Sequence, residues 1–165
     1  MPGMGDVTLS AAQAAFIEGP RSVYATGRDA ARRPSLARVL GCVVADDRRR
    51  VLLIVQSVQA RQVLRDVADN GALAIVFNAP ETHQTLQMKG RGRCVAPPPD
   101  AEALVQQRLA AFTAVIAPHG FAPELVHAIV RGSPDALTAI DFEPQALFEQ
   151  TPGPQAGRRI ADDAR

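Results

Sequence analysis

Lysine is almost missing from this sequence of 165 residues, because Lys89 is the only lysine among 18 basic residues. Such a bias is typical of coding composition, and it lowers the weight that any single arginine carries as a functional signal. The net charge is only +1, so no overall field draws the chain to nucleic acid or to an anionic membrane. No apolar run approaches the roughly 20 residues of a membrane span, and the first residues show no basic region followed by an apolar run and a small-residue cleavage site. We therefore expect a cytoplasmic protein with neither nucleic-acid nor membrane partners.

Cysteine is also scarce. Cys42 and Cys94 lie in strand-like segments, and neither belongs to a C-x-x-C motif or to a Cys/His cluster at zinc spacing. We interpret both as buried thiols and predict no metal site. The chain has no Walker loop and no G-x-G-x-x-G motif after a strand, and none of its three histidines has a metal-ligand partner at a suitable spacing.

What remains is a pattern of short strands and helices in a chain of single-domain size. The sequence Ser10-Ala11-Ala12-Gln13 fits a capping box, S-x-x-Q, which predicts the start of a helix. Apolar runs and period-two alternation predict strands over 22–29, 36–45, 51–55, 72–77, 82–93 and 136–142. Helical spacing predicts helices over 11–18, 57–70, 101–116 and 123–130.

Short turns between most of these strands favour antiparallel pairing, and one strand–helix–strand crossover over 51–77 should supply a parallel or long-range pair. We expect an α+β, mainly β fold: a small closed barrel of about six strands with flanking helices outside. Pro144 should leave its strand at an edge or bend it. Residues 1–150 are predicted to form this domain, and the polar, Pro-Gly segment 151–165 to form an extended tail.

The strongest local candidate for a site is the junction VQSVQAR, residues 55–61, where a buried strand meets a helix. The first turn of a helix offers unpaired N–H groups and binds phosphate or another anion readily. Ser57 is a candidate N-cap, Gln56 and Gln59 add donors, and Arg61 adds charge. The alternative is an ordinary capped helix start with solvated polar groups.

Two further candidates carry charge. Arg38 interrupts an apolar strand, and it either pairs with an acid, reaches solvent or binds a ligand anion. In the strand TLQMK, Thr85, Gln87 and Lys89 share one face, where they could bind a planar heterocycle and a phosphate. A solvated outer strand face explains the same pattern.

Taken in order, the segments FIEGP, VYATGRDA, LARVLGCVV, VLLIVQS with its helix, ALAIVF and THQTLQMKGRGR resemble the pyridoxamine 5'-phosphate oxidase-like, FMN-binding split-barrel family. The resemblance covers roughly residues 10–95. It implies a six-stranded split barrel and a homodimer with two FMN sites at the subunit interface. By position in this resemblance, the expected cofactor-binding residues are Arg38, Val39, Leu40, Gln56, Ser57, Gln59, Thr85, Gln87 and Lys89.

Two segments depart from the family pattern. The phosphate turn of the true oxidases resembles S-R-K, whereas Ser57-Val58-Gln59 lacks both positive charges. The substrate-gripping Arg-x-His pair of the oxidases is missing from TPGPQAGRRIADDAR. We therefore do not assign pyridoxamine 5'-phosphate oxidation to this chain.

Three hypotheses follow. The first is an FMN-dependent oxidoreductase acting on an unknown small-molecule substrate. The second is a non-catalytic dimer that binds flavin or haem, or stays empty. The third is a reductase that uses the deazaflavin F420, whose acidic tail would call for a more basic site than the net charge suggests.

Overall fold

The computed structural model describes residues 7–131 and 136–160. The helices are α1 (Ala11–Glu18), α2 (Arg61–Asn70), α3 (Ala101–Ile116), the short 3-10 helix η1 (Ala117–His119) and α4 (Pro123–Val130). The strands are β1 (Ser22–Arg28), β2 (Pro34–Val44), β3 (Val51–Gln56), β4 (Ala72–Asn78), β5 (Thr85–Val95), β6 (Leu137–Glu149) and β7 (Arg159–Ile160).

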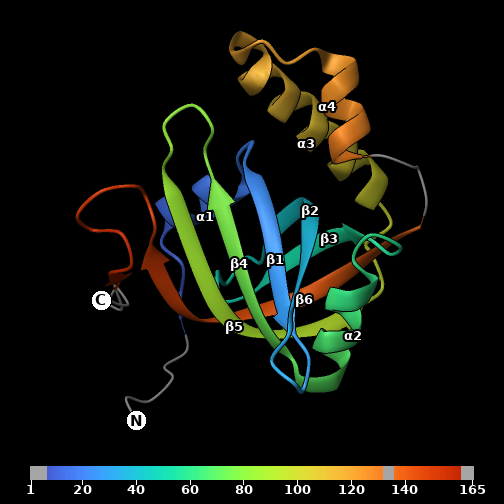
Figure 1. The fold of residues 1–165 in the computed structure, drawn as a ribbon, viewed down its shortest axis with the longest axis vertical. Helices are drawn as coiled ribbons and strands as arrows, with labels where there is room; N and C mark the ends of the chain where they lie inside the picture. Colours follow the sequence, from blue (N-terminus) through green and yellow to red (C-terminus); the bar gives the residue numbers. More distant parts are fainter. Residues whose placement is uncertain (1–6, 132–135, 161–165) are drawn as a thin grey trace.

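The strands form one antiparallel sheet in the order β3-β2-β1-β4-β5-β6-β7. A further pairing of β3 with β6 closes the first six strands into a barrel, as Figure 1 shows. The predicted α+β barrel of six strands is therefore confirmed. The crossover through α2 joins β3 to β4, which do not pair with each other; the long-range pair of β3 is β6 instead.

β6 has 13 residues and continues past the predicted end at residue 142, because Pro144 lies within the strand without ending it. Beyond Phe142 the strand leaves β3 but keeps its pairing with β5, which runs from Ala139 to Glu149, and Leu147 and Phe148 also pair with β7. A proline, which has no N–H to donate, is tolerated at this departure point. The register shifts between Lys89 and Gly90, and Gly90 pairs with Pro144.

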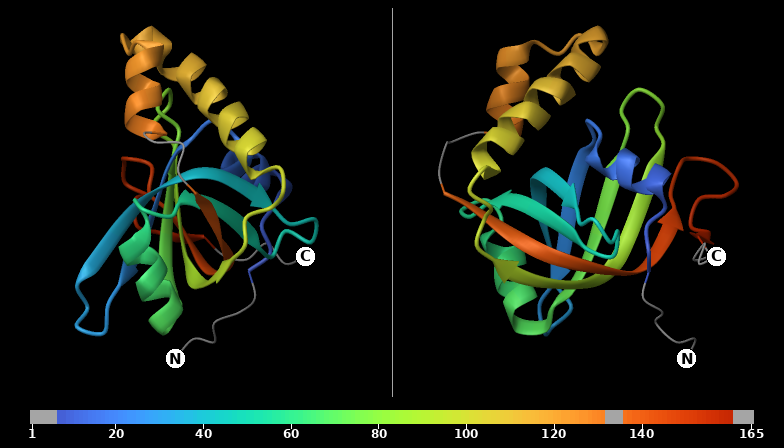
Figure 2. Two further views of the ribbon diagram at one scale, coloured as in Figure 1. Left: turned by 90° about the vertical axis from the view of Figure 1, so that its right-hand side faces the viewer. Right: turned by 180° about the vertical axis from the view of Figure 1, so that it is seen from behind.

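The barrel interior is filled by large apolar side chains, including the fully buried Phe77, Phe142 and Ile75. A second, smaller cluster lies outside the barrel, where Leu40 and Ile54 pack against the start of α3. This cluster covers the outer face of β2 and β3, which explains why both strands are apolar on nearly every position. Figure 2 shows α3 and α4 standing together at one end of the molecule, with α2 at the other.

Several local predictions can be compared with the structure. The capping box at α1 is confirmed, because the side chains of Ser10 and Gln13 each accept the other's backbone N–H. The prediction that Ser57 caps α2 is wrong, since residues 57–60 form a turn and α2 begins at Arg61. Cys42 is buried as predicted, but Cys94 is exposed.

The C-terminal segment differs from the extended tail that we predicted. Residues 151–158 turn back on themselves, and β7 then pairs with the end of β6 through Leu147 and Phe148. Among the described residues, no helix is long and apolar enough to cross a membrane. The same part of the chain contains no group of three His, Cys, Asp or Glu side chains placed to hold a metal ion.

Candidate functional site

An open groove of about 660 Å³ lies on the outer face of the barrel, within the size range of small-molecule sites. It crosses β1, β4 and β5, which lie side by side in Figure 1, and reaches β6 and β7. The residues that line it are Thr26, Gly27, Arg28, Arg32, Pro34, Ala72, Leu73, Ala74, Lys89, Gly90, Gln145, Ala146 and Arg159.

The floor of the groove is made by one cross-strand row of side chains. Thr26 pairs with Ala74, Ala74 with Lys89, and Lys89 with Ala146. Paired residues on antiparallel strands point to the same side of the sheet, and three of these four side chains are small. The row therefore leaves a shallow and largely apolar surface on which a flat ring could lie.

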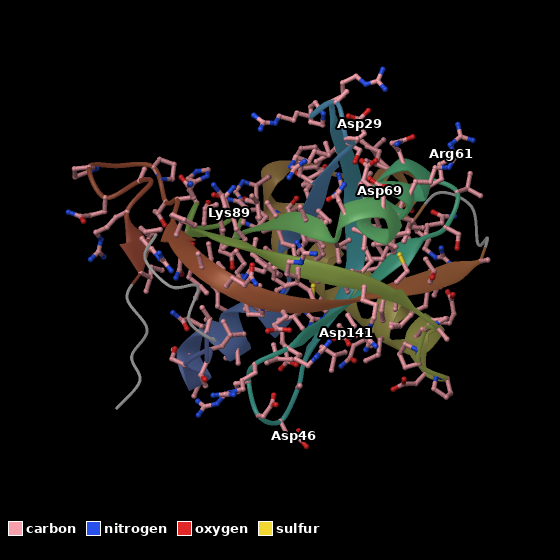
Figure 3. All side chains as sticks on the ribbon, turned by 90° about the horizontal axis from the view of Figure 1, so that it is seen from below. Asp29, Asp46, Arg61, Asp69, Lys89 and Asp141 are labelled. Carbon is pink, nitrogen blue, oxygen red and sulfur yellow. The ribbon has the colours of Figure 1, made fainter. Side chains whose placement is uncertain are left out.

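The rim of the groove is positively charged. Arg28, Arg32 and Arg159 surround the floor, and Lys89, whose backbone belongs to the floor row, adds its ammonium to the same rim; no carboxylate is among the described residues that line the groove. Figure 3 shows Lys89 near the edge of the barrel where β5 meets β6. An apolar floor with a cationic rim can hold a planar, anionic molecule.

Lys89 is the one predicted cofactor residue that lines this groove. The period-two prediction for its strand is confirmed, since Leu86 and Met88 are buried in the barrel while Lys89 is exposed on the other side. Its Nζ atom lies 4.9 Å from the centre of the Phe148 ring. This cation–π contact positions the ammonium over the β5–β6 pair.

Thr85 and Gln87 share the face of Lys89 but lie nearer the start of β5, outside the groove. The Thr85 hydroxyl accepts a hydrogen bond of 2.8 Å from the Asn78 amide and donates one to the His83 carbonyl. The Oε1 atom of Gln87 accepts a 3.1 Å hydrogen bond from the Gln150 amide. Both side chains therefore have structural partners near the β4–β5 turn.

Arg38, Val39 and Leu40 lie at a second cavity, beneath α3 and α4. The Arg38 guanidinium donates a hydrogen bond to the Tyr24 hydroxyl, and its Cζ atom lies 4.6 Å from the centre of that ring. Val39 belongs to the barrel core and Leu40 to the cluster under α3. We call this cavity the arginine cleft, because its lining includes Arg21, Arg38, Arg108 and Arg131.

The remaining predicted cofactor residues lie in and beside the turn after β3, away from both the groove and the lining of the arginine cleft. Gln56 is buried, Ser57 is half-buried with its N–H bonded to the Ala136 carbonyl at 3.0 Å, and Gln59 is exposed. Arg61, at the start of α2, lies on the opposite side of the barrel from Lys89 in Figure 3.

The predicted cofactor residues therefore do not converge within one chain. Val39 pairs with Val55, so Arg38 and Gln56 are next to each other in the β2–β3 register. Lys89 is three strand spacings from β2, or about 14 Å. The rim arginines were missed, because in the sequence they belong to an ordinary turn and tail and only strand pairing brings them to one groove.

No family model and no curated protein matches the sequence. Solved structures, however, match over most of the chain. HupZ of group A Streptococcus has a TM-score of 0.55 at 16% identity, covering 91% of this chain and 100% of its own. A protein from Lactobacillus delbrueckii described as a putative pyridoxamine 5'-phosphate oxidase has a TM-score of 0.53 at 12% identity, with 86% and 93% covered. This chain has the split-barrel fold of the pyridoxamine 5'-phosphate oxidase-like proteins.

A structure described as an F420 reductase also matches this split barrel, with a TM-score of 0.50 at 13% identity over 84% of this chain and 98% of that one. The resemblance seen in the sequence is thus confirmed at the level of the fold. Identities this low show a shared fold and do not decide which molecule the split barrel binds.

Proposed function

We propose that this split barrel binds a flavin-type cofactor in the groove and acts as an FMN-dependent oxidoreductase on a small molecule. The observation that carries the proposal is the combination of a shallow apolar floor and four cations at its rim, with no described carboxylate among the lining residues. FMN joins a flat ring to a phosphate. Its ring suits the floor, and its charge suits the rim.

The groove also supports a homodimer. Its floor is apolar and open to solvent, so a second copy packed on this outer face would remove it from water. Such packing would also bring Arg38 and the Gln56–Gln59 turn of one copy toward the groove of the other. The predicted cofactor residues, which are separated within one chain, would then contribute to a shared site.

Within this proposal the chain binds and orients, and the cofactor supplies hydride chemistry when it is bound. Lys89 would hold the anionic part of the cofactor by a charge-assisted hydrogen bond. The row from Thr26 to Ala146 would support the ring and exclude water from one side of it. Among the described residues that line the groove there is no carboxylate, histidine or cysteine, which suits a reaction in which the protein supplies no strong acid or base.

The deazaflavin F420 is the second candidate cofactor. The acidic tail of F420 calls for a basic site. The net charge of the chain does not suggest such a site, but the four cations at the rim of the groove provide one. One matching structure is also described as an F420 reductase. A non-catalytic flavin- or haem-binding dimer is the remaining alternative.

The visible spectrum of the purified protein, followed by titration of the apoprotein with FMN, F420 and haemin, separates these candidates. We expect a flavin spectrum or saturable binding of FMN. Tighter binding of F420 than of FMN would favour the second candidate, and binding of haemin alone the non-catalytic one. A colourless protein that binds none of the three would overturn the proposal.

A further inference from the structure

The hairpin between β1 and β2 brings two of the four rim cations to the groove. Arg28 is the last residue of β1, and Arg32 lies in the turn that follows; both line the groove and both are exposed. Lys89 is two strand spacings from β1 in the sheet order, or about 10 Å, which the long side chains of arginine and lysine can span from both ends. The hairpin and Lys89 therefore present three cations to the β1 side of the groove.

The one acid of this turn is engaged with a different arginine. Asp29 accepts a hydrogen bond of 2.9 Å from the backbone N–H of Arg33 and one of 2.7 Å from its Nε atom. The backbone bond first, and then the side-chain bond, lower the pKa of the Asp29 carboxyl, so it is ionised at pH 7. Arg33 does not line the groove, and among the described residues no ion pair is seen for Arg28 or Arg32. The acid thus neutralises the arginine outside the groove and leaves the charge of the two that line it.

Both arms of the hairpin are fastened to α2, which Figure 2 shows at the same end of the molecule as the β1–β2 turn. On the β1 arm, the side-chain amide of Asn70 donates a 2.8 Å hydrogen bond to the Arg28 carbonyl. On the β2 arm, the buried Ser35 hydroxyl donates one of 2.5 Å to the buried Asp66 carboxylate. A hairpin that is already held in place loses little conformational freedom when a ligand binds to it, and this preorganisation raises affinity.

The turn is closed by a 2.9 Å hydrogen bond from the Arg32 N–H to the Asp29 carbonyl, and Arg32 has a left-handed φ of 63°. Glycine adopts this conformation without the penalty that a Cβ atom brings. The β2–β3 turn repeats the arrangement, since Arg48 has a φ of 58° and its N–H donates to the Ala45 carbonyl at 2.8 Å. A left-handed arginine is therefore no sign of binding by itself. Arg32 differs from Arg48 because it lines the groove and Arg48 does not.

We propose that the β1–β2 hairpin forms half of the phosphate site of the flavin, with Arg28 and Arg32 on one side of the phosphate and Lys89 on the other. The inference rests on the proposed flavin function and deepens it, because it gives the phosphate two partners that no pattern in the sequence indicated. A phosphate accepts several charge-assisted hydrogen bonds at once, which two guanidiniums and an ammonium can supply. The turn over residues 57–59, predicted from the sequence to hold the phosphate, carries no cation and lies outside the groove. Asp29 is then a positioning residue, because it fixes the turn that carries Arg32.

FMN and riboflavin, which share the ring and differ by the phosphate, are the probes, titrated separately into the flavin-free full chain and followed by flavin fluorescence. Arg32→Gly should lower FMN affinity at least fivefold and change riboflavin affinity less than twofold. Arg48→Gly is the matched control, because it makes the same substitution at the same backbone conformation outside the groove. It should leave both affinities within twofold, and the two variants should change the free energy of unfolding alike. Arg28→Gln is a second variant on the hairpin, with the same expected split between FMN and riboflavin.

Asp29→Ala tests the positioning role, because charge and position predict opposite signs. Removal of a negative charge beside the groove would by itself raise FMN affinity, whereas release of the turn should lower it at least threefold. In the Arg32→Gly background the same substitution should change FMN affinity less than twofold, since Asp29 acts through Arg32.

Three results would count against these assignments, and they can be told apart. Equal losses of FMN and riboflavin affinity in Arg32→Gly, or no loss of either, would overturn the phosphate site and leave the flavin function standing. A higher FMN affinity in Asp29→Ala would overturn the positioning role. A wild-type chain that binds neither flavin would overturn the flavin function itself, and the phosphate site with it.

Discussion

The groove and the arginine cleft each gather four positive side chains, yet they differ in what surrounds the charge. The groove is about 660 Å³, open, and floored by small apolar side chains. The cleft is about 30 Å³ and covered by helices. The comparison teaches that the walls, more than the residue types, decide what can bind: the groove has room for a large planar molecule, and the free space of the cleft does not.

Their charges should also act with different strength. Cations at an exposed rim are screened by salt within a Debye length of about 8 Å at physiological ionic strength. Guanidiniums that are mostly buried, such as Arg21 and Arg131, are screened much less. Each charge in the cleft should therefore act more strongly on its neighbours than a rim charge does.

The largest expected effect concerns the shape of the groove. A Cβ atom at Gly90 would lie 2.0 Å from the Glu143 carbonyl oxygen, a backbone atom that cannot move aside cheaply. We expect Gly90→Ala to lower the free energy of unfolding by about 3 kcal/mol or more, measured by urea denaturation. Gly41→Ala in the cleft is the control, because its nearest neighbour would be 3.4 Å away, and a change within about 0.5 kcal/mol is expected there. A loss of unfolding free energy in Gly90→Ala as small as the one in Gly41→Ala would show that the bulge at Gly90 relaxes to accept the extra carbon.

The next effect tests the charge of the groove. Lys89→Met keeps the length of the side chain and removes its ammonium, so FMN binding should weaken by about 1.5–3 kcal/mol if a charge-assisted bond is lost. Flavin fluorescence titration measures the change. Arg91→Met removes a charge from the same strand and face but outside the groove, and it should leave FMN affinity within twofold. Unchanged FMN affinity in Lys89→Met would mean that Lys89 faces only solvent.

The smallest effect tests the barrel that both sites share. Asp141 on β6 accepts hydrogen bonds from Arg50 at 2.8 Å and from Arg93 at 3.0 Å, joining β6 to the β2–β3 turn and to β5. Asp141→Asn should lower the free energy of unfolding by about 1 kcal/mol, a value reduced by the exposure of Arg93. Asp46→Asn, in the exposed turn labelled in Figure 3, should have no measurable effect.

The same variant has a predicted pH dependence. Burial alone would raise the pKa of Asp141, but the hydrogen bonds and charges of Arg50 and Arg93 outweigh it, and the pKa is lowered from its usual value. A lowered folded-state pKa stabilises the fold above the unfolded-state value of about 3.9, and this stabilisation is lost as the pH falls through the folded-state pKa. The difference between wild type and Asp141→Asn should thus be constant from about pH 5 to 8 and shrink below about pH 4. A difference that grew on acidification would contradict this assignment.

Local rules predicted the parts of the structure that depend on neighbouring residues. The capping box of α1 and the outward face of Lys89 both follow from spacing along a few residues. The same rules failed at Ser57, because residues 57–60 form a turn and α2 begins only at Arg61. They also ended β6 too early, because a proline is tolerated where a strand leaves one of its partners.

The sequence by itself determined most of the strands and helices, the closed α+β barrel and the side of the sheet that faces the core, because each depends on the order and period of apolar residues. Only the tertiary structure decided which cations meet. Arg28, Arg32 and Arg159 reach Lys89 through the register of the sheet, and Arg21 reaches Arg108 and Arg131 through the packing of α3 and α4. Register and helix packing depend on contacts between residues far apart in the chain, so no local pattern carries them.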